Sequence, residues 1–181
     1  MSDKKFTQVV AGLFTSKLIY CMTVWGGVWN KNDQYNNTSI TKEAMRKLQV
    51  CQNKCLRLIT GLDYNTSTKT LLDESKQLSV HQLVAYHSVC QVYRIKKSKL
   101  PAYHYKRLFK SPISEQNTRT RGTEKPNKII DFDLSLARGS FFYQSSRLWD
   151  LLPNNIKEAK TIHMFKRKSK VWIKGNISVR P

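Results

Sequence analysis

Acidic side chains are scarce in this sequence. Its 181 residues include 12 Asp and Glu against 32 Lys and Arg, which gives a formal net charge of +20 at pH 7. The acids are also scattered, and the closest pair is Asp131 and Asp133, which would share one face of an extended segment. Two-metal catalysis needs clustered carboxylates on a rigid support. The segment around this pair offers no such support, so we expect a capped loop there rather than an active site.

Sequence motifs that mark enzymes are missing as well. The chain has no Gly-x-Gly-x-x-Gly or phosphate-loop pattern, no His-Glu-x-x-His and no Gly-x-Ser-x-Gly. Its four cysteines (Cys21, Cys51, Cys55 and Cys90) lie in apolar periodic segments, which is typical of reduced core residues of an intracellular protein. A zinc site in which His87 joins Cys51, Cys55 and Cys90 is the less favoured alternative, because zinc-binding cysteines usually sit on turns. We therefore expect neither a metal nor another cofactor.

Long uninterrupted hydrophobic runs are lacking too. The most apolar stretch, from Val9 to Trp29, carries Lys17 near its middle, where a cation costs about 2.5–3.5 kcal/mol on insertion scales. This disfavours a membrane span, and we expect a buried helix with no membrane partner. Hydrophobic residues still make up 40% of the chain and aromatic residues 10%, which excludes a wholly disordered protein. The length allows one compact domain or two small ones.

Apolar residues recur at three- and four-residue steps through the first 109 residues, which predicts helices. The first predicted helix covers residues 6–25 and ends at Gly26-Gly27. The second begins after Ser39 or Thr41, ends at Gly61 and has the apolar stripe Ala44, Leu48, Cys51, Cys55, Ile59 and Leu62. A short helix is predicted over 68–75. A third long helix opens at the capping box Ser79-x-x-Gln82, stops near residues 96–98 and is followed by a turn at Pro101 and a short helix over 103–109.

The rest of the chain is predicted to hold a linker and two more helices. Residues 110–128 contain Pro112, Gly122 and Pro126 and almost no aliphatic residue, which indicates a flexible basic linker. Residues 129–132 favour a short strand or an extended strap. One helix is predicted from Ser140 to Pro153, and Thr161 caps the last helix. The predicted fold is mostly α: an N-terminal three-to-four-helix bundle (1–109), a basic linker (110–128) and a C-terminal helical pair (129–181).

The positive charge is concentrated in two zones. Residues 94–128 carry 11 basic and two acidic side chains, and residues 157–181 carry eight and one. Such clusters are either solvated faces or sites that attract phosphates, and the lopsided charge favours RNA or DNA bound with low sequence specificity. Four aromatic residues lie among these basic side chains and could stack on unpaired nucleobases: Tyr93, Tyr103, Tyr105 and Phe109. The residues predicted to contact phosphates are Arg94, Lys96, Lys97, Lys99, Lys106, Arg107, Arg119, Arg121, Lys166, Arg167 and Lys170.

Several segments, taken in order, resemble the C-terminal third of reverse transcriptases of jockey-like non-LTR retrotransposons. They include LFTSKLIYCMTVWGGVW, LQVCQNKCLRLITGLDYNTST, GSFFYQSSRLWDLLPNNIK and FKRKSKVWI. The resemblance implies thumb helices followed by a basic helical tail that handles RNA or a template–primer. In that family the catalytic aspartates lie upstream, in palm motifs with a Phe/Tyr-Ala-Asp-Asp box, and this sequence has no such box. The resemblance therefore implies a non-catalytic part of an RNA-directed DNA polymerase, with Met1 shortly before the first thumb helix as in a truncated or separate reading frame.

Two other interpretations stay open. The stripe of Phe6, Leu13, Phe14 and Trp25 could dock on a partner, such as a separate chain that carries the palm. Alternatively, the chain is a relic with no selected function. Without the palm, either the first helices bundle with the terminal pair or an apolar patch remains exposed. In each case we expect the protein to reside inside the cell, in the nucleus, the cytoplasm or both.

Overall fold

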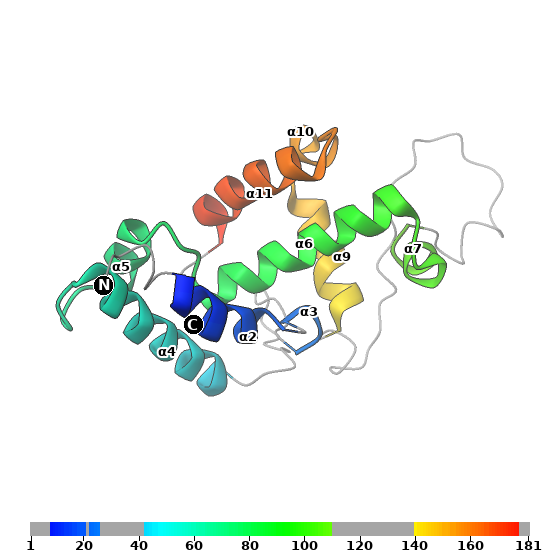
Figure 1. The fold of residues 1–181 in the computed structure, drawn as a ribbon. Helices are drawn as coiled ribbons and strands as arrows, with labels where there is room; N and C mark the ends of the chain where they lie inside the picture. Colours follow the sequence, from blue (N-terminus) through cyan, green and yellow to red (C-terminus); the bar gives the residue numbers. More distant parts are fainter. Residues whose placement is uncertain (1–7, 21, 26–41, 110–139, 178–181) are drawn as a thin grey trace, which may run out of the picture.

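The computed structural model describes residues 8–20, 22–25, 42–109 and 140–177, and most of these residues are helical (Figure 1). No strand occurs within these ranges, so the prediction of a mostly α fold is confirmed. In chain order the helices are the π-helix η1 (Ala11–Thr15), α2 (Ser16–Ile19), α3 (Met22–Trp25), α4 (Lys42–Thr60), α5 (Thr68–Glu74), α6 (Val80–Ser98), α7 (Ala102–Phe109), α9 (Phe141–Leu151), α10 (Asn154–Lys157) and α11 (Ile162–Asn176).

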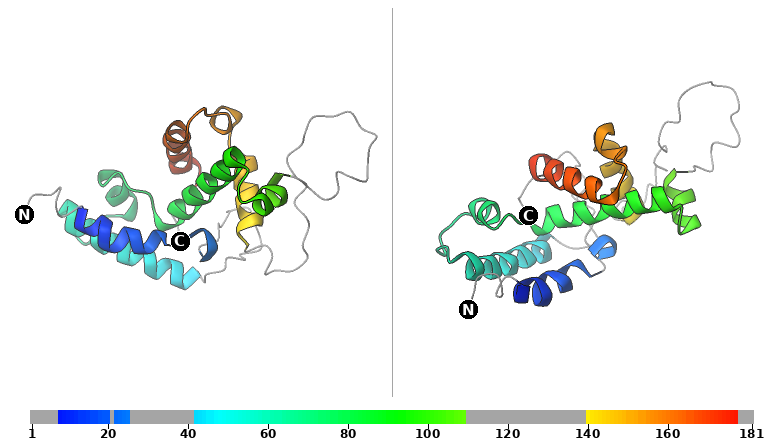
Figure 2. Two further views of the ribbon diagram at one scale, coloured as in Figure 1. Left: turned by 45° about the vertical axis from the view of Figure 1, so that its right-hand side comes forward. Right: turned by 45° about the horizontal axis from the view of Figure 1, so that its top comes forward.

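Helix α6 lies at the centre of the molecule. It contacts α3, α4, α7, α9 and α11, and its most extensive contacts are with α11 and α9. Figures 1 and 2 show α11 beside α6, α9 crossing α6, and α7 at the far end of α6. Twelve side chains of α6 are buried, nine of them apolar or aromatic, so this helix is covered on most of its circumference, as expected for a core helix.

Several helix boundaries follow from local capping. Ser67, Ser79, Ser140 and Thr161 each accept a hydrogen bond from the backbone N–H three residues later, which satisfies one of the free donors of the first turn. The predicted capping box is complete, since Gln82 Oε1 accepts from the Ser79 N–H at 3.1 Å. Gly61, with φ of +68°, ends α4 by donating to the Arg57 carbonyl at 2.8 Å. The ends predicted at Gly61, Ser79, Ser140 and Thr161 are confirmed.

The first predicted helix is not continuous. A π-helical turn precedes α2, and Tyr20 separates α2 from α3. The Ser16 hydroxyl donates to the Gly12 carbonyl, a competing bond of the kind that bends helices, and the Tyr20 N–H is shared between the carbonyls of Ser16 and Lys17. The predicted single stripe is therefore wrong in part: Leu18 and Met22 are buried, whereas Leu13 is exposed.

Helix α4 turns a different face inward from the predicted one. Cys51, placed in the apolar stripe by its spacing, is exposed, and Cys55 is half-buried. The buried positions include three amide side chains, Gln49, Gln52 and Asn53. Gln49 donates to Gln52 Oε1 and Asn53 Oδ1 at 2.8 and 2.9 Å and accepts from the Val80 N–H at 2.9 Å. Because these amides hydrogen-bond one another and the start of α6, burying them does not leave polar groups unpaired.

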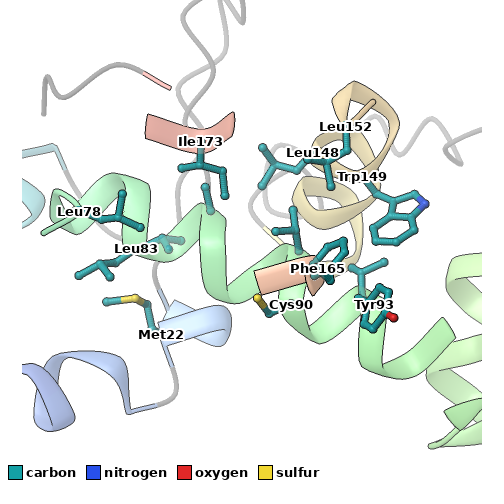
Figure 3. Close-up of a cluster of buried hydrophobic side chains, with 14 of the residues drawn as sticks. Met22, Leu78, Leu83, Cys90, Tyr93, Leu148, Trp149, Leu152, Phe165 and Ile173 are labelled. Carbon is teal, nitrogen blue, oxygen red and sulfur yellow. The ribbon is translucent and has the colours of Figure 1, made fainter. Parts of the chain in front are cut away.

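One hydrophobic core joins both ends of the chain. It includes Leu18 and Met22 from the first helices, the apolar side of α6, and Leu148, Phe165 and Ile173 from the last ones, and Figure 3 shows Met22 and Ile173 on different sides of α6. Phe165 is fully buried and stacks on Tyr93, with ring centroids 4.3 Å apart. The first helices and the terminal pair therefore share one core with α6, as the first of the two predicted alternatives expected, while Leu13 and Val24 stay exposed, as the second expected.

Several predicted features lie outside the described residues. These are the caps Ser39 and Thr41, the linker over 110–128, the strand or strap over 129–132 and the pair Asp131 and Asp133. Within the described ranges, no helix has the length and apolar character needed to cross a membrane.

Candidate nucleic-acid interface

A pocket of about 210 Å³ lies where α2, α3, α6 and α11 meet. One stripe of α6 forms much of its wall, because Tyr86, Cys90 and Arg94 follow one another at intervals of one helical turn. The pocket lining consists of Ile19, Met22, Thr23, Tyr86, His87, Cys90, Gln91, Arg94 and Lys166. Arg94 and Lys166 come from the two separate basic zones of the sequence, so the fold brings these zones to one place.

The two cations of the pocket act on its other ionisable groups. Burial lowers the pKa of His87, and the positive charges of Arg94 and Lys166 lower it further. Burial raises the pKa of the Cys90 thiol, and the hydroxyl of Tyr86 has its pKa raised to about 12, mainly by burial. No carboxylate lines this pocket. Near neutral pH the pocket therefore holds two fixed positive charges and uncharged His, Cys and Tyr side chains.

A row of lysines continues from the pocket along α11. Lys166, Lys170 and Lys174 are spaced by one helical turn, and α11 carries no acidic residue. Lys170 Nζ lies 3.5 Å from the Lys76 carbonyl, and Lys174 Nζ pairs with Asp73 at 2.9 Å. Arg167, on the same helix, is exposed, and Lys168 donates to the Asn155 carbonyl at 3.2 Å. The row therefore runs from the pocket toward α5, with Lys166 and Lys170 available for an anion.

The lysine side chains at the C-terminal end of α6 cover aromatic rings. Lys96 Nζ lies 5.3 Å from the centroid of Trp149, and Lys97 Nζ lies 5.8 Å from that of Tyr93. Both lysines are exposed, as is Lys99, which ends α6 with φ of +57°. The ammonium groups thus reach solvent while their stems cover the core.

Helix α7 presents a second basic and aromatic group. Arg107 donates to the Tyr103 hydroxyl at 2.6 Å, and its guanidinium lies 4.6 Å from the centroid of the Phe142 ring. Tyr103 is 61% exposed and meets Phe142 edge-on, with centroids 6.3 Å apart. Lys106 is exposed beside it. Arg107 and Phe142 therefore hold Tyr103 in a fixed orientation at the surface.

The other three aromatic residues of this zone are not free to stack on bases. Tyr93 is 3% exposed and donates to the Ala159 carbonyl at 2.7 Å. Phe109 is half-buried against Trp149, and Tyr105 packs on Phe109. The alternation of aromatic and basic residues therefore combines core rings with one surface ring.

Two predicted phosphate contacts and the alternative zinc site remain to be placed. Arg119 and Arg121 lie outside the described residues. In the described part of the chain, no three His, Cys, Asp or Glu residues are grouped closely enough to hold a metal ion.

Some pocket residues were not found from the sequence. The sequence indicates His87 as part of a less favoured zinc site and Cys90 as a core cysteine or a ligand of that site, and Thr23 and Gln91 belong to no motif. Their position beside Arg94 depends on the docking of α3 and α11, which the spacing along α6 does not reveal.

Comparison with known proteins gives no relative: no protein-family model, curated protein or solved structure matches the chain. A function for this chain therefore rests on its own residues.

Proposed function

We propose that this chain binds the phosphates of RNA or DNA, with low sequence specificity and without catalysing a reaction. One observation carries the proposal: Arg94 and Lys166, from two basic zones of the sequence, line one pocket that has no carboxylate in its lining. Helices α6 and α11, which both line the pocket, contain eight Lys and Arg residues and no Asp or Glu, so the positive charge of these two helices is little neutralised. Charge of this kind attracts phosphates of any sequence.

The resemblance to the C-terminal region of non-LTR retrotransposon reverse transcriptases supports the same role. On that interpretation, the chain grips RNA or a template–primer for an RNA-directed DNA polymerase whose catalytic aspartates lie in a palm. The mostly helical fold agrees with thumb helices followed by a basic tail.

The salt dependence of binding tests the proposal. We expect fluorescence anisotropy with a labelled oligonucleotide to give a log–log slope of roughly −4 to −7, since each neutralised phosphate contributes about −0.7 for single strands and −0.9 for duplex DNA. Replacing Arg94, Lys97 and Lys170 with Gln should make this slope shallower by about 2 to 2.7.

A second triple variant with the same loss of charge is the control. Lys47, Lys54 and Lys69 are exposed on α4 and α5, away from the pocket, and replacing them with Gln should leave the slope nearly unchanged. A wild-type slope near zero with both RNA and DNA, or equal losses in the two triple variants, would overturn the proposal.

Docking of a partner protein is the second candidate function. Leu13, Tyr20 and Val24 are 70%, 77% and 69% exposed, so the first helices leave apolar surface uncovered. Phe14, expected to be part of this surface, packs partly against the core instead. Association through this surface, with a palm-bearing chain or another partner, would be insensitive to salt. It would be lost in Leu13→Ser/Val24→Ser and kept in Leu58→Ser/Val171→Ser, whose wild-type residues are equally exposed.

A further inference from the structure

The pocket between α3, α6 and α11 has the chemistry of an anion site. It combines the guanidinium of Arg94 and the ammonium of Lys166 with the hydroxyl of Thr23 and the amide of Gln91, contributed by three different helices. Ile19 and Met22 close one side with apolar groups, which lowers the local dielectric and strengthens ionic hydrogen bonds. Two cations that face one pocket also repel each other until an anion binds between them.

His87 is the one group in this lining whose residue type ordinarily titrates near neutral pH, and its surroundings lower its pKa. The charged or titratable groups around it are Tyr86, Cys90 and Arg94 on its own helix and Lys166 on α11, while α2 and α3 contribute Ile19, Met22 and Thr23, which do not titrate. The Tyr86 ring meets the imidazole edge-on at 5.4 Å. Tyr86, with a pKa of about 12, and Cys90, with a raised pKa, stay neutral at pH 7.

We propose that this pocket binds a single phosphate group of a nucleic acid and that binding is coupled to uptake of a proton by His87. The inference rests on the proposed function, and it adds the place where one phosphate sits and a dependence on pH. In the free protein, burial and the charges of Arg94 and Lys166 disfavour a third positive charge. A bound phosphate compensates those charges, so the imidazolium becomes favourable once the site is filled.

The sign of the effect follows from linkage. If the complex holds one more proton than the free protein, affinity rises as the pH falls, by at most tenfold for each pH unit within the titration range. An internal phosphodiester does not titrate in this range, whereas a terminal phosphate has a second pKa of about 6. The cleanest probe is therefore an oligonucleotide with a 5′-hydroxyl, whose own charge stays constant.

The experiment follows the imidazole signals by NMR while ligand is added. The chain has four histidines, so His81, His104 and His163 serve as internal controls, and His87→Asn assigns the remaining signal. Inorganic phosphate and the 5′-hydroxyl oligonucleotide should both shift the His87 signal toward its protonated form, whereas chloride at equal ionic strength should not. A larger shift with a 5′-phosphorylated oligonucleotide would assign the pocket to chain ends, and an equal shift would assign it to internal phosphates.

Three variants complete the test. Lys166→Gln should abolish the His87 response, whereas Lys168→Gln, with the same charge change on the same helix, should keep it; unchanged signals of the other three histidines show that each variant is folded. His87→Asn should reduce the gain in affinity for the 5′-hydroxyl oligonucleotide that the wild type shows between pH 8 and pH 6, and an undiminished gain would overturn the role of His87.

The two proposals fail in different ways. If the oligonucleotide binds with a steep salt dependence while the His87 signal stays still, the pocket inference is overturned and the proposed function stands. If the oligonucleotide does not bind at all, the proposed function fails, and with it the assignment of the pocket to nucleic acid.

Discussion

Tyr103 is held at the surface by two neighbours, Arg107 and Phe142, rather than by burial. A ring fixed in this way offers a flat face to an unpaired base at little cost in side-chain entropy. Tyr93 also lies among basic residues in the sequence, but it is in the core, where it stacks on Phe165. Sequence alone could not separate the two tyrosines, because both lie beside lysines and the burial of Tyr93 depends on a helix some 70 residues further along the chain.

Tyr103→Ala should weaken binding of single-stranded RNA or DNA by about 1–3 kcal/mol, the usual loss for one stacked base, and should leave duplex binding nearly unchanged. Parallel anisotropy titrations with a single strand and its duplex measure the difference. Tyr64→Ala is the matched control, since Tyr64 is 79% exposed and lies 5.1 Å from the guanidinium of Arg57. Equal losses in the two variants would show that Tyr103 is not a stacking surface.

At the scale of the element, the sequence predicted where the helices lie better than which face each turns inward. Helix α4 is the clearest case, because regular apolar spacing pointed to Cys51 and Cys55, while the buried side includes Gln49, Gln52 and Asn53. A prediction from the spacing of apolar residues treats Gln and Asn as polar and therefore places them at the surface. Their burial becomes favourable only when partners exist, and here Gln52 donates to the Leu78 carbonyl and Asn53 to Thr68 Oγ1, both at 2.9 Å.

The hydrogen bonds among the buried amides Gln49, Gln52 and Asn53 lead us to predict an effect on stability. Gln49→Leu removes the acceptor of the Val80 N–H and two donated hydrogen bonds, and leaving buried polar groups unpaired costs about 1–3 kcal/mol each. We expect urea denaturation to show a loss of at least that size. Gln77→Leu, at an exposed position just before α6, should change the unfolding free energy much less, and a similar loss in both variants would contradict the role of Gln49.

At the scale of the whole molecule, α9 and α11 pack on α6 and share its core. The sequence divided the chain into a bundle over 1–109 and a tail over 129–181, and it gave no sign that the two basic zones meet at Arg94 and Lys166. That meeting depends on the pairing of α6 with α11, helices too far apart along the chain for periodicity to relate. The composition does give the net charge from which we infer the proposed class of ligand, because the docking of helices redistributes charge without changing its total.

The packing predicts how a fragment behaves. Residues 1–109 expressed alone should unfold without a cooperative transition in urea, because α6 would expose the faces that bury Tyr93 and Val89 in the whole chain. Circular dichroism and dye binding to exposed apolar surface measure this, with the full chain as the control. A sharp transition in the fragment would instead favour the division at residue 109.

The bond from Gln82 Nε2 to the Ile177 carbonyl, 2.8 Å long, joins the first turn of α6 to the residue that follows α11. The two residues that form this hydrogen bond are synthesised seconds apart, because a ribosome adds about 5–20 residues per second. Between completion of α6 and completion of α11 the nascent chain waits roughly 4–16 s at that rate. Throughout this interval α6 lacks the helix that makes its most extensive contacts, so the nascent chain exposes apolar surface that the finished protein buries.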